Sequence, residues 1–224
     1  MNDRLAVHGF VLAGGKSTRM GEDKALTQFC GTPMIELAVQ KLCSFCAEVG
    51  IAGNREDLAC YAPVVHEVRL ESGPAAGIEA ALMVASQPWV LFVPVDVPLA
   101  PMGVLRRWVE SVIGADEDER SSGSYLLVEG LPQPAFCLLR KECLTAWSAL
   151  LNEGERRLAC LLREIRVQGR SAVNAVAAER FVTVAELEST EMAYRFSNIN
   201  TPLELAAVEA AALDTYRKPG RERG

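Results

Sequence analysis

The stretch WVLFVPV (residues 89–95) limits the possible folds more than any other part of this sequence. It is nearly all apolar, so a strand formed there must be buried on both faces, which is typical of the middle of a parallel sheet. Asp96 follows it directly, and Pro98 and Pro101 then end the strand and begin a helix. The stretch therefore predicts an α/β protein.

Further apolar segments alternate with helical patterns along the chain. Strands are predicted at 8–12, 49–52, 64–65, 125–128 and 134–139, and helices after 32–33 and 73–77 and at 140–152, 155–164 and 201–216. This alternation predicts a three-layer, Rossmann-like α/β fold, with a mostly parallel central sheet and helices on both faces. Ligands bind such sheets outside the carboxyl ends of the strands, where the strand order switches.

Local signals predict where several elements begin or end. Thr32 is expected to cap a helix that has Pro33 at its first position. The apolar face of that helix consists of Ile35, Ala38, Val39, Leu42 and Cys46. Thr201 and Glu204 form a capping box for an alanine-rich helix. Residues 114–123 (GADEDERSSG) read as a polar loop and a seam within the fold.

Composition excludes several classes of protein. The 224 residues are 50% hydrophobic and suit one domain, expected at 1–213 with halves of about 1–113 and 123–213 and a tail at 214–224. The net charge of -6 argues against a broad basic surface for nucleic acid. The first residues lack the apolar run of a signal peptide, and no segment approaches the roughly 20 apolar residues that span a bilayer. We therefore expect a cytoplasmic protein that binds neither nucleic acid nor membranes.

The cysteines and histidines offer little chemistry. An odd number of cysteines, seven, argues against a disulfide framework. Cys43 and Cys46 form a C-x-x-C pair, which is either a redox or metal half-site or, as we favour, two thiols on one helix. His8 and His66 are the only histidines, and both are interpreted as structural.

The loop after the first strand carries a concentration of glycines and cations. Gly14 and Gly15 allow the backbone to approach a phosphate closely, and successive N–H groups then bind the anion. Lys16, Arg19 and Lys24 add positive charge. An ordinary glycine-rich turn would not explain these cations directly after a buried strand.

Two familiar phosphate-binding motifs do not fit this loop. A P-loop needs a glycine five positions before Gly15, where this chain has Phe10, and Gly9 misses by one position. A dinucleotide-binding loop needs G-x-G-x-x-G, which Gly14 and Gly15 do not supply.

The loop LAGGKSTRMGEDK (residues 12–24) resembles the signature of nucleotidyltransferases, and most closely that of the molybdenum cofactor guanylyltransferases. Four later segments resemble family motifs in the same order, so that the resemblance runs from about residue 9 to 208: GPAAG (73–77), PVDVP (94–98), GERR (154–157) and NINTP (198–202). It implies a nucleotidyltransferase fold that transfers GMP from GTP to the terminal phosphate of molybdenum-molybdopterin, with Mg²⁺ as cofactor. It also implies the molybdenum-insertion enzyme and proteins that deliver cofactor to apo-molybdoenzymes as partners.

The resemblance carries site roles onto individual residues. Those matching nucleotide-binding positions are Leu12, Ala13, Gly14, Lys24, Glu67 and Asp96, of which Asp96 also holds the metal. Those matching positions near the pterin substrate are Gly15, Arg19, Asn198 and Asn200. Arg19, Lys24 and Asp96 are the expected catalytic residues.

The chain departs from the family pattern at several places. Glu67 stands where Asp is usual, Val95 and Val97 replace the residues around the aspartate, Gln133 replaces a histidine, and Ala52 replaces an asparagine. None of these changes removes a group that carries charge.

Simpler roles stay open for some residues. Asp96 could cap the helix after Pro98, and Asn198 and Asn200 could only shape the turn before Thr201. For the function, the alternatives are a CTP-dependent cytidylyltransferase, a nucleotidyltransferase with another phosphorylated acceptor, and a non-catalytic cofactor carrier.

Overall fold

The computed structural model describes residues 4–14, 23–69, 73–119, 121–183 and 192–217. Seven strands form one sheet in the order β5-β4-β1-β6-β8-β7-β9. Their bounds are β1 Leu5–Leu12, β4 Cys46–Ala52, β5 Val64–Val65, β6 Trp89–Pro94, β7 Ser121–Val128, β8 Leu131–Arg140 and β9 Ser171–Ala177. Of these seven, β8 alone runs opposite to the others, because it pairs antiparallel with both β6 and β7. The predicted mostly parallel sheet is therefore confirmed.

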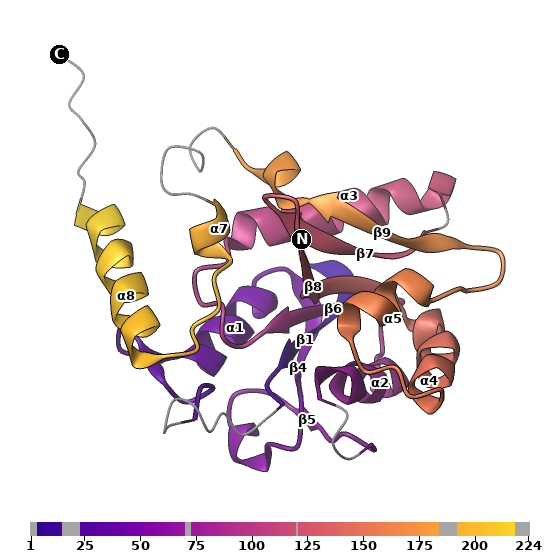
Figure 1. The fold of residues 1–224 in the computed structure, drawn as a ribbon, viewed down its shortest axis with the longest axis horizontal. Coiled ribbons are helices and arrows are strands. Elements are labelled where there is room, and N and C mark those ends of the chain that lie inside the picture. Colours follow the sequence, from indigo (N-terminus) through magenta and orange to yellow (C-terminus); the bar gives the residue numbers. More distant parts are fainter. Residues whose placement is uncertain (1–3, 15–22, 70–72, 120, 184–191, 218–224) are drawn as a thin grey trace.

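Helices cover both faces of the sheet, so the predicted three layers are present (Figure 1). On one face, α1 (Met34–Cys43) and α3 (Met102–Glu119) pack against the apolar cluster that contains Val11 and Leu91. On the other face, α2 (Pro74–Val84), α4 (Leu144–Asn152) and α5 (Leu158–Glu164) pack against the cluster that contains Phe10 and Phe92. Neighbouring residues of β1 and of β6 thus enter opposite cores, which is why nearly all residues of both strands are apolar.

The sequence of connections places a ligand site at the end of β1. From β1 the chain moves outward to β4 and β5 and then returns to β6 on the other side of β1. The strand order therefore switches between β1 and β6, and loops leaving these two strands diverge and leave room for a ligand. Gly14 follows β1 and Asp96 follows β6, so both lie at this edge.

Segment 89–95 lies in the middle of the sheet, as predicted, but its surroundings are mixed. β6 pairs parallel with β1 on one side and antiparallel with β8 on the other. The reversal arises at the β7–β8 hairpin, where Glu129 and Gly130 both have positive φ (49° and 76°). Two such residues form the tight turn whose twist matches that of paired strands.

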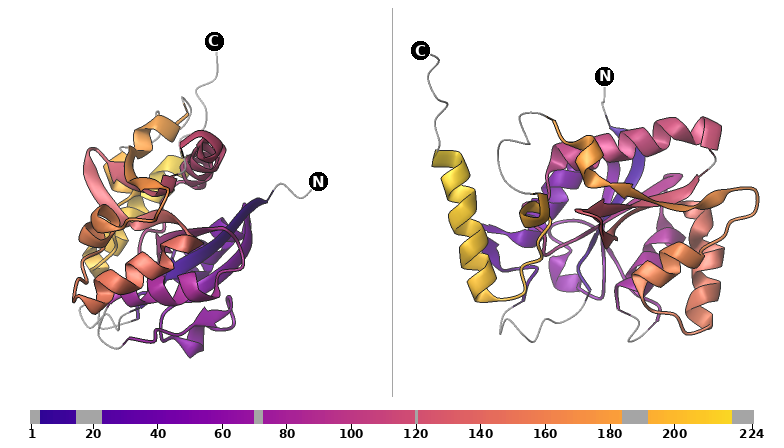
Figure 2. Two further views of the ribbon diagram at one scale, coloured as in Figure 1. Left: turned by 90° about the vertical axis from the view of Figure 1, so that its right-hand side faces the viewer. Right: turned by 45° about the horizontal axis from the view of Figure 1, so that its top comes forward.

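The C-terminal region lies at the side of the molecule. A short helix α7 (Met192–Arg195) precedes α8 (Pro202–Arg217). Figures 1 and 2 show α8, in yellow, standing beside the body of the sheet. The predicted capping box is confirmed, since Glu204 N–H donates to Thr201 Oγ1 (3.2 Å) and Thr201 N–H donates to Glu204 Oε2 (2.9 Å).

The predicted cap of α1 is wrong. Pro33 occupies the N-cap position without a side-chain hydrogen bond, and Thr32 instead belongs to a small hairpin of β2 (Gln28–Phe29) and β3 (Thr32–Pro33). The first N–H groups of α1 donate to an earlier turn, Met34 to Thr27 O (3.0 Å) and Ile35 to Ala25 O (2.9 Å). Cys46 does not continue the helix, because it begins β4.

The predicted polar loop at 114–123 is also wrong. Helix α3 continues to Glu119, and β7 begins at Ser121. Polar residues suit this strand because their hydroxyls find partners, as when Ser122 Oγ donates to Ser171 O (2.6 Å) and Trp108 Nε1 donates to Ser124 Oγ (3.0 Å). The partner Ser171 begins β9, a strand that the sequence analysis missed.

The cysteines and histidines take structural places. All seven cysteines are free, with Cys46 buried in β4 and Cys43 exposed at the end of α1. His8 stacks on Phe10 (centroids 4.2 Å apart), and His66 pairs with Glu56 (3.0 Å). Among the described residues, no helix is both long and apolar enough to cross a lipid bilayer.

Strand β7 supplies a test of the fold at Gly123. This buried glycine has φ +155°, and an added Cβ would collide with Leu138 O and lie 2.9 Å from Leu139 Cδ2. We expect Gly123→Ala to lower the free energy of unfolding by about 2–4 kcal/mol, measured by urea unfolding.

The matched control is Gly114→Ala on the exposed side of α3, where nothing lies within 4 Å of the new Cβ. It should stabilise the protein by about 0.5–1 kcal/mol, because alanine favours helix more than glycine does. Equal effects of the two substitutions would contradict the placement of Gly123 between β8 and β9.

Candidate active site

The backbone after β1 is held by the residues that follow β4. Ala13 N–H donates to Ala52 O (3.1 Å), which extends the pairing of the two strands. Gly53 has φ +151°, and a Cβ there would lie 3.0 Å from Gly14 N and 3.1 Å from its Cα. Only a glycine at position 53 allows this close approach, so Gly53 fixes the path of Leu12, Ala13 and Gly14.

Glu67 lies directly over this loop. Its Oε1 atom is 2.8 Å from the place where a Cβ of Gly14 would stand and 3.6 Å from the corresponding place at Gly77. Burial raises the pKa of the Glu67 carboxyl above its usual value. Its backbone N–H donates to Asn54 Oδ1 (3.0 Å), so the segment after β4 also positions this carboxylate.

A partly buried ion pair anchors the chain on the other side of Glu67 from Asn54. Arg69 Nε and Nη2 donate to Glu79 Oε2 and Oε1 of α2 (2.6 and 3.0 Å). Glu79 is 5% exposed, and the arginine, with Ser148, keeps its pKa below the usual value although burial acts in the opposite direction. Residues on both sides of Glu67 are therefore fixed to neighbouring elements.

Three distant segments meet at Lys24. Its Nζ atom lies 3.2 Å from Asp96 Oδ2 and 2.5 Å from Asn200 Oδ1. The side chains of Lys24 and Asp96 are 17% and 20% exposed, so a ligand can still reach this pair. The cation of the glycine loop, the acid after β6 and the asparagine before α8 thus occupy one place.

Backbone contacts hold Asp96 and Asn200 in register. Ile199 N–H donates to Asp96 O (2.8 Å), and Val95 N–H donates to Leu12 O (3.3 Å). Below them, Lys41 Nζ of α1 donates to Pro98 O, and burial lowers the pKa of Lys41 to about 8. The segment 95–98 is therefore tied to β1, to α1 and to the residues before α8.

These contacts bear on the simpler roles that the sequence left open for Asp96 and Asn200. Asp96 directs its carboxylate to Lys24, whereas α3 begins only at Met102, so helix capping does not account for this side chain. Asn200 reaches Lys24 with its side chain while its backbone N–H donates to Glu204 Oε2 (2.6 Å). Asn200 therefore does more than shape a turn.

The donor set suits a magnesium ion that arrives with phosphates. No group of three or more acidic, cysteine or histidine ligands occurs among the described residues. Mg²⁺ in nucleotide sites typically binds one or two carboxylates, with phosphate oxygens and water completing the shell. Asp96 can supply that carboxylate, so the residues present fit this kind of metal site.

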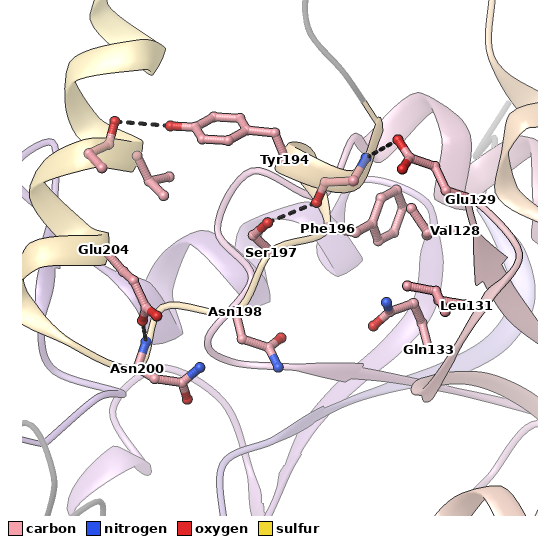
Figure 3. Close-up of a pocket in the computed structure, with 13 residues that line it drawn as sticks. Val128, Glu129, Leu131, Gln133, Tyr194, Phe196, Ser197, Asn198, Asn200 and Glu204 are labelled. Atoms are coloured by element: carbon pink, nitrogen blue, oxygen red, sulfur yellow. Dashed lines mark hydrogen bonds between the residues drawn. The ribbon is translucent and has the colours of Figure 1, made fainter.

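A cavity of about 500 Å³ opens beside Asn200. Figure 3 shows Asn198 and Gln133 on opposite sides of it, with Asn200 and Glu204 at the end nearer to α8. Glu129 lies at the rim, where its Oε1 accepts a hydrogen bond from Ala193 N–H (3.3 Å). The lining combines apolar side chains with several polar ones, which suits a heterocycle with hydrogen-bonding groups.

The structure thus brings most of the predicted residues to one edge of the sheet. Leu12, Ala13, Gly14, Lys24, Glu67, Asp96 and Asn200 lie along it, with Asn198 in the adjoining cavity. Gly15 and Arg19 lie outside the described residues, and so does Lys16. The sequence analysis missed Gly53, Asn54 and Glu129. For Gly53 and Asn54 the available signal was a glycine followed by polar residues directly after a strand.

Comparison with known proteins bears on the identity of this site. Residues 9–172 match the family described as the MobA-like NTP transferase domain. The chain belongs to this family. It is therefore a nucleotidyltransferase, and the matched region contains the loop after β1, Glu67 and Asp96.

Relatives within this family cover nearly the whole chain. A probable molybdenum cofactor guanylyltransferase from Pelotomaculum thermopropionicum is 32% identical over 219 residues, which cover 97% of this chain and 98% of the relative. A molybdenum cofactor guanylyltransferase from Vibrio cholerae is 31% identical over 201 residues, 88% of each chain.

Solved structures show the same fold. The molybdopterin-guanine dinucleotide biosynthesis protein A from Archaeoglobus fulgidus superposes with a TM-score of 0.72, 21% identity, and coverage of 92% of this chain and 99% of that one. The 2-C-methyl-D-erythritol 4-phosphate cytidylyltransferase from Thermus thermophilus reaches 0.59 at 18% identity, with coverage of 91% and 98%. The fold is thus shared by nucleotidyltransferases of the MobA-like family and by a cytidylyltransferase.

The contact between Gly14 and Glu67 yields a prediction about nucleotide binding. A methyl group on Gly14 would force the Glu67 carboxylate to move, because only 2.8 Å separates it from Oε1. We expect Gly14→Ala to raise the KM for the nucleotide about tenfold or more, in steady-state measurements of pyrophosphate release.

Gly77→Ala is the matched control on the other side of the same carboxylate. Its nearest contacts, Ala52 Cβ at 3.5 Å and Glu67 Oε1 at 3.6 Å, are ordinary van der Waals distances. It should leave the KM within about twofold, because an unstrained contact costs little. A normal KM in Gly14→Ala would show that Glu67 does not border the nucleotide.

Proposed function

We propose that this enzyme transfers GMP from GTP to the terminal phosphate of molybdenum-molybdopterin and releases pyrophosphate. The observation that carries the proposal is the meeting of Lys24, Asp96 and Asn200. It supports the proposal because a cation and a carboxylate suited to Mg²⁺ lie together where the two substrates would meet. We assign the nucleotide to the half at about 1–113 and the acceptor to the half at about 123–213. The guanylyltransferase relatives support this choice of substrates.

The reaction balances without a general base. An ionised oxygen of the acceptor phosphate attacks the α-phosphorus of GTP and forms a new P–O–P bond. The bond from the α-phosphorus to the β-bridging oxygen breaks, and pyrophosphate leaves with that electron pair. Since the nucleophile is already ionised at neutral pH, the enzyme has to position two anions and offset their charge.

Residues of this chain perform those two tasks. The backbone of Ala13 and Gly14 would lie close to the nucleotide, and Lys24 would stabilise the charge on the reacting phosphates. Arg19 is proposed as a second cation. Asp96 would hold a magnesium ion, which would offset phosphate charge and orient the phosphates. Asn198 and Asn200 would bind the acceptor beside Gly15.

Glu67 supports guanine as the base. Guanine presents two adjacent donors, N1–H and the 2-amino group, which match the two oxygens of one carboxylate. Cytosine presents one donor beside an acceptor nitrogen, and a carboxylate repels that acceptor. Among the described residues, the Glu67 side chain has no hydrogen-bond donor as partner, so it is available to a base.

The test of the function is pyrophosphate release from GTP and from CTP, with molybdopterin and molybdate present. We expect release with GTP, and loss of release when magnesium is chelated. Release with CTP alone would replace the guanylyl assignment by the cytidylyl one. Tight binding of GTP or pterin with no release from either nucleotide would favour the carrier alternative.

Glu67→Gln tests the origin of the base preference. It should reduce the ratio of kcat/KM for GTP to that for CTP by about 10- to 100-fold, the usual worth of a two-bond contact to a base. Because burial raises the pKa of Glu67, the wild-type preference should also weaken as the pH falls, before ordinary carboxylates are protonated. Glu67→Gln should lack this pH dependence. An unchanged GTP preference in the variant would remove Glu67 from base recognition.

Asp96→Asn and Lys24→Met test the charge-bearing groups. Each should lower kcat/KM for GTP by about 10²- to 10³-fold, as when other preorganised charges are removed. Glu110→Gln is the control, because it breaks only the exposed ion pair with Arg106 on α3 (2.7 Å) and should leave the rate unchanged. Near-normal turnover of Asp96→Asn would remove the magnesium assignment.

A cytoplasmic location and the further protein partners remain predictions of the sequence.

A further inference from the structure

We infer that Arg55 is a positioning residue for Lys24, acting through Asp23. Arg55 does not reach the reacting groups, but it holds the turn that presents the Lys24 ammonium to them. The inference rests on the proposed role of Lys24 in binding the reacting phosphates.

Arg55 is one of few charged side chains buried in the described part of the chain. It is 8% exposed and lies three residues after the end of β4, at the edge of the sheet that carries the site. Its Nε and Nη2 atoms donate to Asp57 Oδ1 and Oδ2 (2.9 and 2.7 Å), and its Nη1 donates to Asp23 Oδ1 (2.9 Å). Asp57 and Asp23 hold the pKa of the guanidinium above its usual value, although burial opposes them.

One of these two carboxylates begins the turn that contains Lys24. Asp23 Oδ1 accepts the N–H of Ala25 (3.0 Å), and Asp23 O accepts the N–H groups of Leu26 (3.0 Å) and Thr27 (2.9 Å). Thr27 Oγ1 also donates to Asp23 O (3.0 Å). Four hydrogen bonds thus converge on Asp23, so fixing Asp23 fixes the backbone of Lys24.

The turn is held from two directions. Its carbonyls at Ala25 and Thr27 accept the first N–H groups of α1, and its acid end is bound by Arg55. The same short segment after β4 backs Gly14 through Gly53 and binds the Glu67 backbone through Asn54. Arg55 is therefore the residue of this segment that supports the turn containing Lys24.

A purely structural role would predict a different result from a positioning role. Asp23 and Asp57 contact the same guanidinium, but only Asp23 is connected to Lys24, since Asp57 lies on the outer side and is 53% exposed. If Arg55 only stabilises the fold, losing either acid should have similar effects on the rate. If Arg55 positions Lys24, only the loss of Asp23 should lower the rate.

The experiment measures kcat/KM for pyrophosphate release, and the melting temperature, for Arg55→Met, Asp23→Asn and Asp57→Asn. Arg55→Met and Asp23→Asn should each lower kcat/KM by about 10- to 100-fold, because a displacement near 1 Å can cost that much. Asp57→Asn should stay within about twofold. Asp23→Asn keeps an oxygen for Ala25 N–H, so it tests the idea even if Arg55→Met does not fold.

The same substitutions are then made in the Lys24→Met background. Because Arg55 acts through Lys24, Arg55→Met and Asp23→Asn should lower the residual rate less than about twofold further. Losses of equal factor in both backgrounds, or a loss in Asp57→Asn as large as in Asp23→Asn, would overturn the inference while leaving the proposed function intact. A Lys24→Met enzyme with normal activity would overturn both the role of Lys24 and the inference.

Discussion

The site depends on the place of one ammonium group between two oxygen-bearing side chains. Lys24 Nζ contacts Asp96, which follows β6, and Asn200, which precedes α8. An ammonium shared in this way is strongly attracted to any phosphate that enters, because phosphate brings more negative charge than the carboxylate and amide. The same contact connects the edge of the sheet with the segment that borders the cavity, since Asn200 lines that cavity.

The rest of the architecture can be understood as support for that group. The switch in strand order between β1 and β6 opens the edge at which Lys24 and Asp96 meet. Lys41 and Ile199 then tie the segment after β6 to α1 and to the chain before α8. Polar contacts among partly buried groups are strong only when every partner is held in place, and here each partner is bound by a separate element.

The features predicted correctly from the sequence depend on contacts between residues close together in the chain. The buried strand followed by Asp96 and the Thr201 capping box both lie within short windows, and the structure places both as expected. The failures have a common origin in contacts across the fold. The serines of 121–124 look like a loop until Trp108 and Ser171 provide partners, and Thr32 looks like a cap until the β2–β3 hairpin uses it.

The same limit explains why the supporting residues of the site were missed. Arg55 and Asp23 are separated by 32 positions, and neither belongs to a motif of fixed spacing. Only the folded chain shows that three successive residues after β4 each contact a different part of the site. Gly53 packs against Gly14, Asn54 binds the Glu67 backbone, and Arg55 binds Asp23 in the turn that contains Lys24. The replacement of the family asparagine by Ala52 in the preceding strand fits this arrangement, because Ala52 contributes a backbone carbonyl to Ala13 and its side chain is enclosed in the core. Under the proposed function, base recognition falls to the carboxylate of Glu67, which that segment holds over the loop.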